Sequence, residues 1–125
     1  MTLGYWLAVA AGGALGAVGR AGVAATLPSE GAFPLQTYVV NVLGSFVIGL
    51  VWAGVSRPDT SVLWSAFIVT GILGGFTTFS TFSLETLQLL EQGAWRTACL
   101  YLFLSLLTCV GGAGAGVMLC RLVAH

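Results

Sequence analysis

Long, uninterrupted apolar blocks limit what this chain can fold into. The sequence contains four such blocks, near Leu3 to Leu27, Pro34 to Val55, Ser61 to Leu90 and Trp95 to Val123. A helix needs roughly 20 mostly apolar residues to cross the hydrocarbon core of a bilayer, and each block is long enough. Only 6% of the 125 residues are charged, far below the level of about 25% in soluble domains. The sequence therefore predicts an all-α integral membrane protein with four transmembrane helices in a single domain, residues 1–125.

The connectors between the blocks are short and carry residues that stop helices. They read "PSEGAF", "SRPDT" and "EQGA", and Pro, Gly, Ser and Asp are typical of turns. No soluble domain fits in such connectors. The N-terminal stretch "MTLGYWLAVAAGGALG" lacks the basic region of a secretory signal, so we expect it to be a retained first helix.

The third block is too long for a straight span, at about 30 residues with a rise of 1.5 Å each. Its excess coincides with "GGFTTFST", in which glycines and threonines are poor helix formers. We therefore predict that the helix is broken between Gly74 and Thr78, in the middle of the membrane. Irregular backbone at that depth is tolerated only where protein or a water-filled cavity satisfies it.

The few basic residues give no bias for orientation in the membrane. Arg57 and Arg121 fall at one end of the predicted bundle, and Arg96 and Arg20 fall towards the other. The positive-inside rule counts such charges near helix ends. Two interpretations stay open: another feature sets one orientation, or the protein inserts both ways round.

The second block carries a polar stripe in otherwise apolar surroundings. Thr37, Asn41 and Ser45 are spaced four residues apart, so they lie along one helix face. A buried amide such as Asn41 either forms an interhelical hydrogen bond or lines a polar path. The continuing hydroxyls on the same face favour the path.

A related stripe follows the fourth block. Tyr101, Ser105, Thr108, Cys109 and Gly112 recur at offsets of three and four, which gives a narrow polar track. Small residues at the same spacing would equally serve close helix packing. The three cysteines fit neither a metal motif nor a redox pair, and we interpret them as small packing residues.

Two charged residues lie within the apolar blocks. Arg20 either extends its side chain to the interface or pairs with a carboxylate, and interfacial placement is the simpler interpretation. Glu85 is the only acidic residue of the third block. We predict a structural or vestibule role for both residues.

Two phenylalanines of the third block stand among hydroxyls. Phe79 and Phe82 are three residues apart, so they share a helix face. Phenylalanines at this spacing are usually core residues, but five hydroxyl-bearing residues surround this pair. The edge of an aromatic ring is partly positive, so a ring presented edge-on can contact an anion without a formal charge.

The sequence offers no catalytic set. The single histidine, His125, ends the sequence, and Asp59 lies in a connector. Neither a nucleophile with a base nor paired carboxylates occur at a plausible spacing. We therefore do not expect an enzyme.

The segments "GALGAVGR", "NVLGSFVIG" and "GILGGFTTFSTFSLE" together resemble the Fluc or CrcB family of fluoride channels, over the whole chain. The resemblance implies a homodimer of antiparallel, dual-topology subunits with two pores. It also implies that Phe79, Phe82, Asn41, Tyr101 and Ser105 line those pores. A central sodium ion would be held by backbone carbonyls of Gly74 and Thr77 from both subunits.

The implied function agrees with the chemistry of these residues. Fluoride is strongly hydrated, so passage needs donors that replace its water, including the hydroxyls of Thr81 and Ser83, without a full charge that would trap it. We therefore expect passive export of fluoride from the cytoplasm across the cell membrane, which reduces fluoride toxicity. One alternative is a small dual-topology, proton-coupled exporter of multiple drugs or quaternary cations, which needs a membrane-embedded carboxylate. Another is a non-conducting assembly subunit, which would leave the hydroxyl stripes unexplained.

Overall fold

The structure, a computed structural model, describes residues 1–124, and His125 lies outside the described residues. Within that part of the chain, four helices are long and apolar enough to cross a membrane. They are α1 (Leu3–Ala25), α2 (Leu35–Val55), a third long helix (Val62–Glu91) and α6 (Trp95–Val123). The third helix consists of α3 (Val62–Ser65), η1 (Ala66–Leu73), α4 (Gly74–Phe76) and α5 (Phe79–Glu91).

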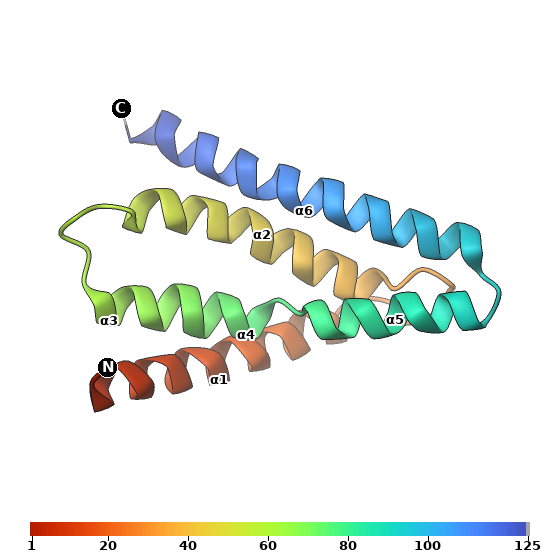
Figure 1. The fold of residues 1–125 in the computed structure, drawn as a ribbon, viewed down its shortest axis with the longest axis horizontal. Coiled ribbons are helices and arrows are strands. Elements are labelled where there is room, and N and C mark those ends of the chain that lie inside the picture. Colours follow the sequence, from red (N-terminus) through yellow and green to blue (C-terminus); the bar gives the residue numbers. More distant parts are fainter. Residues whose placement is uncertain (125) are drawn as a thin grey trace.

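The four long helices pack as two pairs. Helix α2 lies along α6, whereas α1 lies along η1 and α4. Figure 1 shows α2 between α6 and the third helix, with both ends of the chain at the same end of the bundle. The four helices therefore run alternately up and down. The expected helix bounds differ from those in the structure by at most two residues.

Glycines let the backbones of paired helices touch. Gly12 and Gly16 of α1 are buried, and a methyl group at either position would collide with the backbone oxygen of Phe67 or Ile72. Between α2 and α6, Gly49 and Gly116 face the partner backbone just as closely. Such small-residue contacts are the usual means of close helix packing in membranes.

The third helix changes its backbone conformation at two threonines. Thr77 has φ −82° and ψ 158°, and Thr78 has φ −147° and ψ 117°, so both are extended. We predicted that the irregular stretch begins at Gly74, but Gly74 to Phe76 are helical, and that boundary is corrected. The reason is packing: a Cβ at Gly75 would lie 2.6 Å from the carbonyl oxygen of Gly13. The depth of Thr77 and Thr78 in the bilayer stays a prediction.

A tight turn after α5 reverses the chain, so that α6 runs back beside α5. Gly93 has a φ of 77°, which glycine adopts without strain. Its N–H donates to the Leu90 carbonyl at 3.1 Å, and that of Ala94 donates to the Leu89 carbonyl at 2.9 Å. This pairing satisfies carbonyls at the end of α5. As a result α6 returns beside α5, and Phe82 and Leu89 form a core with Ala98 and Tyr101.

Candidate functional site

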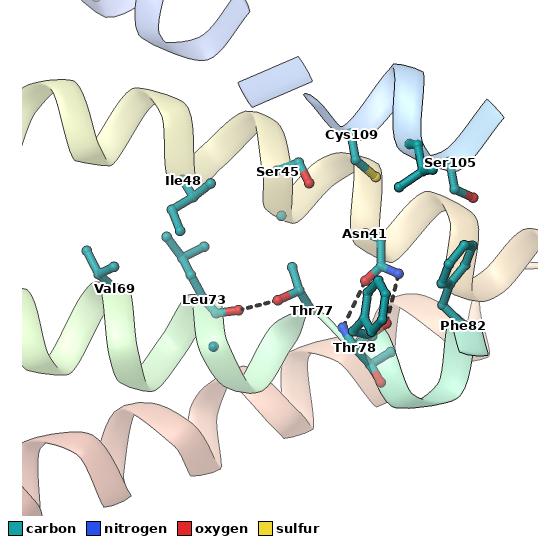
Figure 2. Close-up of a pocket in the computed structure, with 14 residues that line it drawn as sticks. Asn41, Ser45, Ile48, Val69, Leu73, Thr77, Thr78, Phe82, Ser105 and Cys109 are labelled. Atoms are coloured by element: carbon teal, nitrogen blue, oxygen red, sulfur yellow. Dashed lines mark hydrogen bonds between the residues drawn. The ribbon is translucent and has the colours of Figure 1, made fainter. Parts of the chain in front are cut away.

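A cavity of about 320 Å³ lies between α2, the third helix and α6. We call it the Asn41 cavity. Figure 2 shows Asn41 and Ser45 on one side, Thr77 and Thr78 on another, and Ser105 with Cys109 on α6. The remaining lining is mostly apolar and includes Ile48, Val69, Leu73, Phe79 and Phe82. The cavity thus combines a few polar groups with an apolar wall, as ligand sites commonly do.

Asn41 binds the backbone of Thr78 with both ends of its side-chain amide. Its Nδ2 donates to the Thr78 carbonyl at 2.9 Å, and its Oδ1 accepts from the Thr78 N–H at 2.8 Å. Figure 2 shows the two bonds side by side. Because an amide nitrogen carries two hydrogens, one N–H donor of Asn41 is left for the cavity.

The backbone before Thr78 is also marked by an unusual hydrogen-bond pattern. The N–H of Thr77 donates to the Leu73 carbonyl at 3.1 Å, and the Thr77 hydroxyl donates to the same oxygen at 3.0 Å. In an α-helix the next bond would join the Thr78 N–H to the Gly74 carbonyl. The Thr78 N–H is directed to Asn41 instead, so the Gly74 carbonyl loses its regular donor.

The two phenylalanines differ in burial although both line the Asn41 cavity. Phe79 is 73% exposed, and Phe82 is 5% exposed. Their ring centroids lie 5.5 Å apart, and the Phe82 ring lies 5.0 Å from that of Tyr101. Phe82 is therefore fixed by the protein core, whereas Phe79 projects from the surface of the chain.

Ser105 and Tyr101 of α6 have different surroundings. Ser105 lines the Asn41 cavity and is 5% exposed, yet its hydroxyl has no hydrogen-bond partner within the described residues. Tyr101 is fully buried behind Phe82, and its hydroxyl donates to Glu85 at 3.3 Å. Ser105 is thus a donor available to the cavity, and Tyr101 supports the aromatic wall.

A second cavity, of about 210 Å³, lies next to the first. We call it the Arg20 cavity. Its lining includes Arg20, Thr37, Thr78 and Thr81, and the Nε of Arg20 is buried without a hydrogen-bond partner in residues 1–124. The Thr81 hydroxyl accepts from that of Thr78 at 3.0 Å. Thr78 lines both cavities, so its bonds to Asn41 form part of the wall between them.

The structure divides the predicted site residues into separate groups. Asn41, Phe79, Phe82, Ser105, Gly74 and Thr77 share the Asn41 cavity, and Arg20 and Thr81 share the other one. Ser83, Glu85 and Tyr101 line neither of these two cavities, and the Ser83 hydroxyl donates to the Phe79 carbonyl at 2.9 Å.

The cavities are also lined by polar or sulfur-bearing residues that were not among the predicted site residues: Gln36, Thr37, Ser45, Thr78 and Cys109. Thr78 could have been found in the sequence as a threonine three residues before Thr81, at the start of a helix. In the structure its hydroxyl caps α5 by accepting from the Thr81 N–H at 3.2 Å. Thr37, Ser45 and Cys109 belonged to the predicted polar stripes, but no role was predicted for them.

Comparison with known proteins shows which family the chain is related to. A family profile described as "CrcB-like protein, Camphor Resistance (CrcB)" matches residues 7–117. The chain is 41% identical over 116 residues to the fluoride-specific ion channel FluC of Saccharophagus degradans, covering 91% of this chain and 87% of that protein. It is 47% identical over 120 residues to the protein of the same name from Rhodospirillum centenum, covering 92% and 94%. For the one from Opitutus terrae the identity is 48% over 103 residues, covering 77% and 76%. The chain belongs to the CrcB-like family.

Proposed function

We propose that this protein is a fluoride-selective channel of the membrane, which lets fluoride leave the cytoplasm passively and so reduces its toxicity. Relatives that are 41% and 47% identical over nearly their whole length carry the name fluoride-specific ion channel. The four apolar helices make the chain a multi-pass membrane protein.

The observation that carries this function is the Ser105 hydroxyl in the Asn41 cavity. A buried hydroxyl without a partner costs free energy, so a group that accepts its hydrogen bond would be favoured there. Phe79 and Phe82 line the same cavity, and their ring edges are partly positive. An anion small enough to enter would meet donors and ring edges but no full charge, which permits exit as well as entry.

We further propose an antiparallel, dual-topology homodimer with two pores. Phe79 is 73% exposed at the rim of a cavity that a single subunit leaves partly open, and a second subunit would close it. The balanced arginines agree with insertion in both orientations. A cysteine in place of the exposed Gln92, in a chain whose three native cysteines are alanines, would test this: an impermeant thiol reagent should label about half of the molecules in intact cells. Labelling of all or none of them would contradict dual topology.

Backbone carbonyl oxygens of the third helix could hold the proposed structural sodium ion. Gly74 and Thr77 would hold it through backbone carbonyls, and the Gly74 carbonyl has lost its regular donor to Asn41. Carbonyl oxygens suit hard cations, as do the ends of broken helices in transporters. Within residues 1–124 no cluster of three or more His, Cys, Asp or Glu side chains occurs, and the proposed ligands are backbone oxygens. When bound, the ion would supply positive charge near the pores.

The alternative of a proton-coupled exporter is less well supported. Such a transporter needs a carboxylate that faces the substrate, but Glu85 lines neither of the two cavities and accepts a hydrogen bond from Tyr101. A non-conducting assembly subunit would not require the unpartnered Ser105 hydroxyl.

The experiment that tests the proposed function is ion efflux from liposomes that contain the purified protein. Fluoride release should be fast and chloride release no faster than from empty liposomes, as read with ion-selective electrodes. Absence of fluoride release, or equal release of chloride, would overturn the proposal. Release driven by a proton gradient and a quaternary cation would favour the exporter.

A further inference from the structure

The hydrogen bonds around Thr78 suggest a role for Asn41 that pore lining alone does not require. An uninterrupted helix would pair the Thr78 N–H with the Gly74 carbonyl, four residues before it. Thr77 still follows this four-residue spacing, because its N–H donates to the Leu73 carbonyl, as does its hydroxyl. This spacing stops at the residue whose N–H donates to Asn41 Oδ1 at 2.8 Å. The Asn41 side chain therefore takes the place of the Gly74 carbonyl.

The side chain of Asn41 satisfies both polar groups of the Thr78 backbone at once. Its Oδ1 and Nδ2 lie 2.8 Å and 2.9 Å from the Thr78 nitrogen and oxygen. In apolar surroundings a backbone N–H without a partner is costly. Without Asn41, the Thr78 N–H could find an acceptor within the third helix by bonding to the Gly74 carbonyl. Forming this bond requires Thr77 to turn from extended to helical.

Helix α2 is built to approach the two threonines closely. Gly44 lies three residues after Asn41, on the same face of α2, and a methyl group there would collide with the side-chain methyl of Thr77. The absence of a side chain at Gly44 thus lets α2 come near enough for the Asn41 amide to reach Thr78. Two positions of α2 therefore serve the same stretch of backbone.

We infer that Asn41 is a positioning residue for the cation site: by holding Thr78 it keeps the third helix interrupted and leaves the Gly74 carbonyl open to a monovalent cation. This inference rests on the sodium ion of the proposed function. The bonds to Thr78 leave one Nδ2 hydrogen of Asn41 without a bond to that residue, and Asn41 lines the cavity that we propose as the fluoride path. One amide then links the backbone that holds the cation to the path that carries the anion.

The test compares Asn41→Ala with the unchanged protein in detergent, using a readout that needs no ion flux. In protein labelled at threonine with ¹³C and ¹⁵N, the Cα shifts of Thr77 and Thr78 should move from extended towards helical values in the variant. Heat unfolding is followed by tryptophan fluorescence while sodium replaces N-methylglucamine at constant ionic strength, because a ligand of the folded state raises its stability. The sodium concentration for half of the stabilisation should rise about 2- to 10-fold, the effect of one lost hydrogen bond.

Asn41→Asp keeps the acceptor oxygen of the side chain and removes the amide donor. It also provides a test if the alanine variant does not fold. Its carboxylate can still accept the Thr78 N–H, so Thr77 should stay extended and the response to sodium should persist. Ser45→Ala is the matched control, because Ser45 lines the same cavity from α2 and its hydroxyl forms no hydrogen bond with Thr77 or Thr78 in the described part of the chain.

The results decide whether Asn41 positions the cation site, whichever ion the channel transports. Unchanged threonine shifts in Asn41→Ala, an unchanged sodium midpoint in that variant, or an aspartate variant that behaves like alanine would each overturn the inference. A change of the same size in Ser45→Ala would overturn it as well. Failure of the proposed function would be recognised separately, as absence of fluoride flux in the unchanged protein, while the threonine shifts would still report on the Asn41 contact.

Discussion

The two halves of the third helix are held in place in opposite ways. From Val62 to Phe76, the helix packs backbone against backbone on α1, at positions where Gly12 and Gly16 leave no room for a side chain. From Phe79 to Glu91, it packs through large side chains, with Phe82 and Leu89 against Ala98 and Tyr101. The first half should therefore be sensitive to added atoms, and the second half to removed atoms. The polar groups of both cavities gather where the two halves meet.

The largest effect should come from Gly16→Ala in the first contact. The new methyl group would collide with the backbone oxygen of Ile72, so α1 and η1 would have to separate along their length. Overpacking of this kind costs about 1–3 kcal/mol or more. We expect a clear fall of the melting temperature in detergent, followed by tryptophan fluorescence, and loss of monodisperse protein on size exclusion.

Gly13→Ala is the control for this change, because a Cβ there meets no atom within 4 Å. It lies in the same helix and adds the same methyl group, and alanine favours the helix more than glycine does. Its melting temperature should be unchanged or higher. Equal losses in the two variants would show that helix propensity, rather than backbone contact, decides the first half.

The second half can be tested through its two phenylalanines. Phe82→Ile removes a buried ring that lies 5.0 Å from Tyr101, whereas Phe79→Ile alters a ring that is 73% exposed. We expect about 1 kcal/mol of lost stability for Phe82→Ile and less for Phe79→Ile. Fluoride efflux should fall to the leak of empty liposomes in both variants. Normal efflux in both would remove the rings from the ion path, and equal instability would contradict the difference in burial.

Much of the fold could be predicted from the sequence because the signals are local. Runs of apolar residues and short polar connectors place the four helices within two residues of their bounds. The pairing of helices and the π-helical winding of Ala66–Leu73 could not be predicted, because they depend on which backbones come into contact. For the same reason Gly74 was interpreted as a helix breaker, although Gly75 beside it serves the contact with Gly13.

The candidate site was predictable in its residue types but not in its bonds. The spacing of Asn41 with Thr37 and Ser45 marks a polar face, yet nothing local indicates that its amide reaches Thr78, 37 residues further along the chain. Phe79 and Phe82 share a helix face by spacing, but their different burial depends on where Tyr101 lies. The functional roles of these residues stay predictions that the variants test.

A smaller effect is expected from Tyr101→Phe, which leaves the ring in the core and removes the hydroxyl. The lost bond to Glu85, at 3.3 Å, should cost about 1 kcal/mol, measured as a lower melting temperature. Tyr38→Phe is the matched control, because the Tyr38 ring packs on Phe33 at 5.4 Å and its hydroxyl forms no hydrogen bond in the described part of the chain. If Tyr101→Phe were as stable as Tyr38→Phe, the contact with Glu85 would not stabilise the second half of the third helix.

We expect the smallest effect on stability from Ser105→Ala. This variant best distinguishes a role in folding stability from a role in ion conduction. The Ser105 hydroxyl is buried without a partner in residues 1–124, so its removal breaks no hydrogen bond and relieves the cost of an unsatisfied donor. The melting temperature should stay the same or rise slightly, while fluoride efflux from liposomes should fall at least about tenfold, as expected when an anion loses one donor. Thr108→Val removes a hydroxyl from the same helix that donates to the Leu104 carbonyl at 2.6 Å, and it should leave efflux unchanged. A residue that lowers conduction without lowering stability acts on the ion, whereas equal efflux in the two variants would mean that the Ser105 hydroxyl does not face the path.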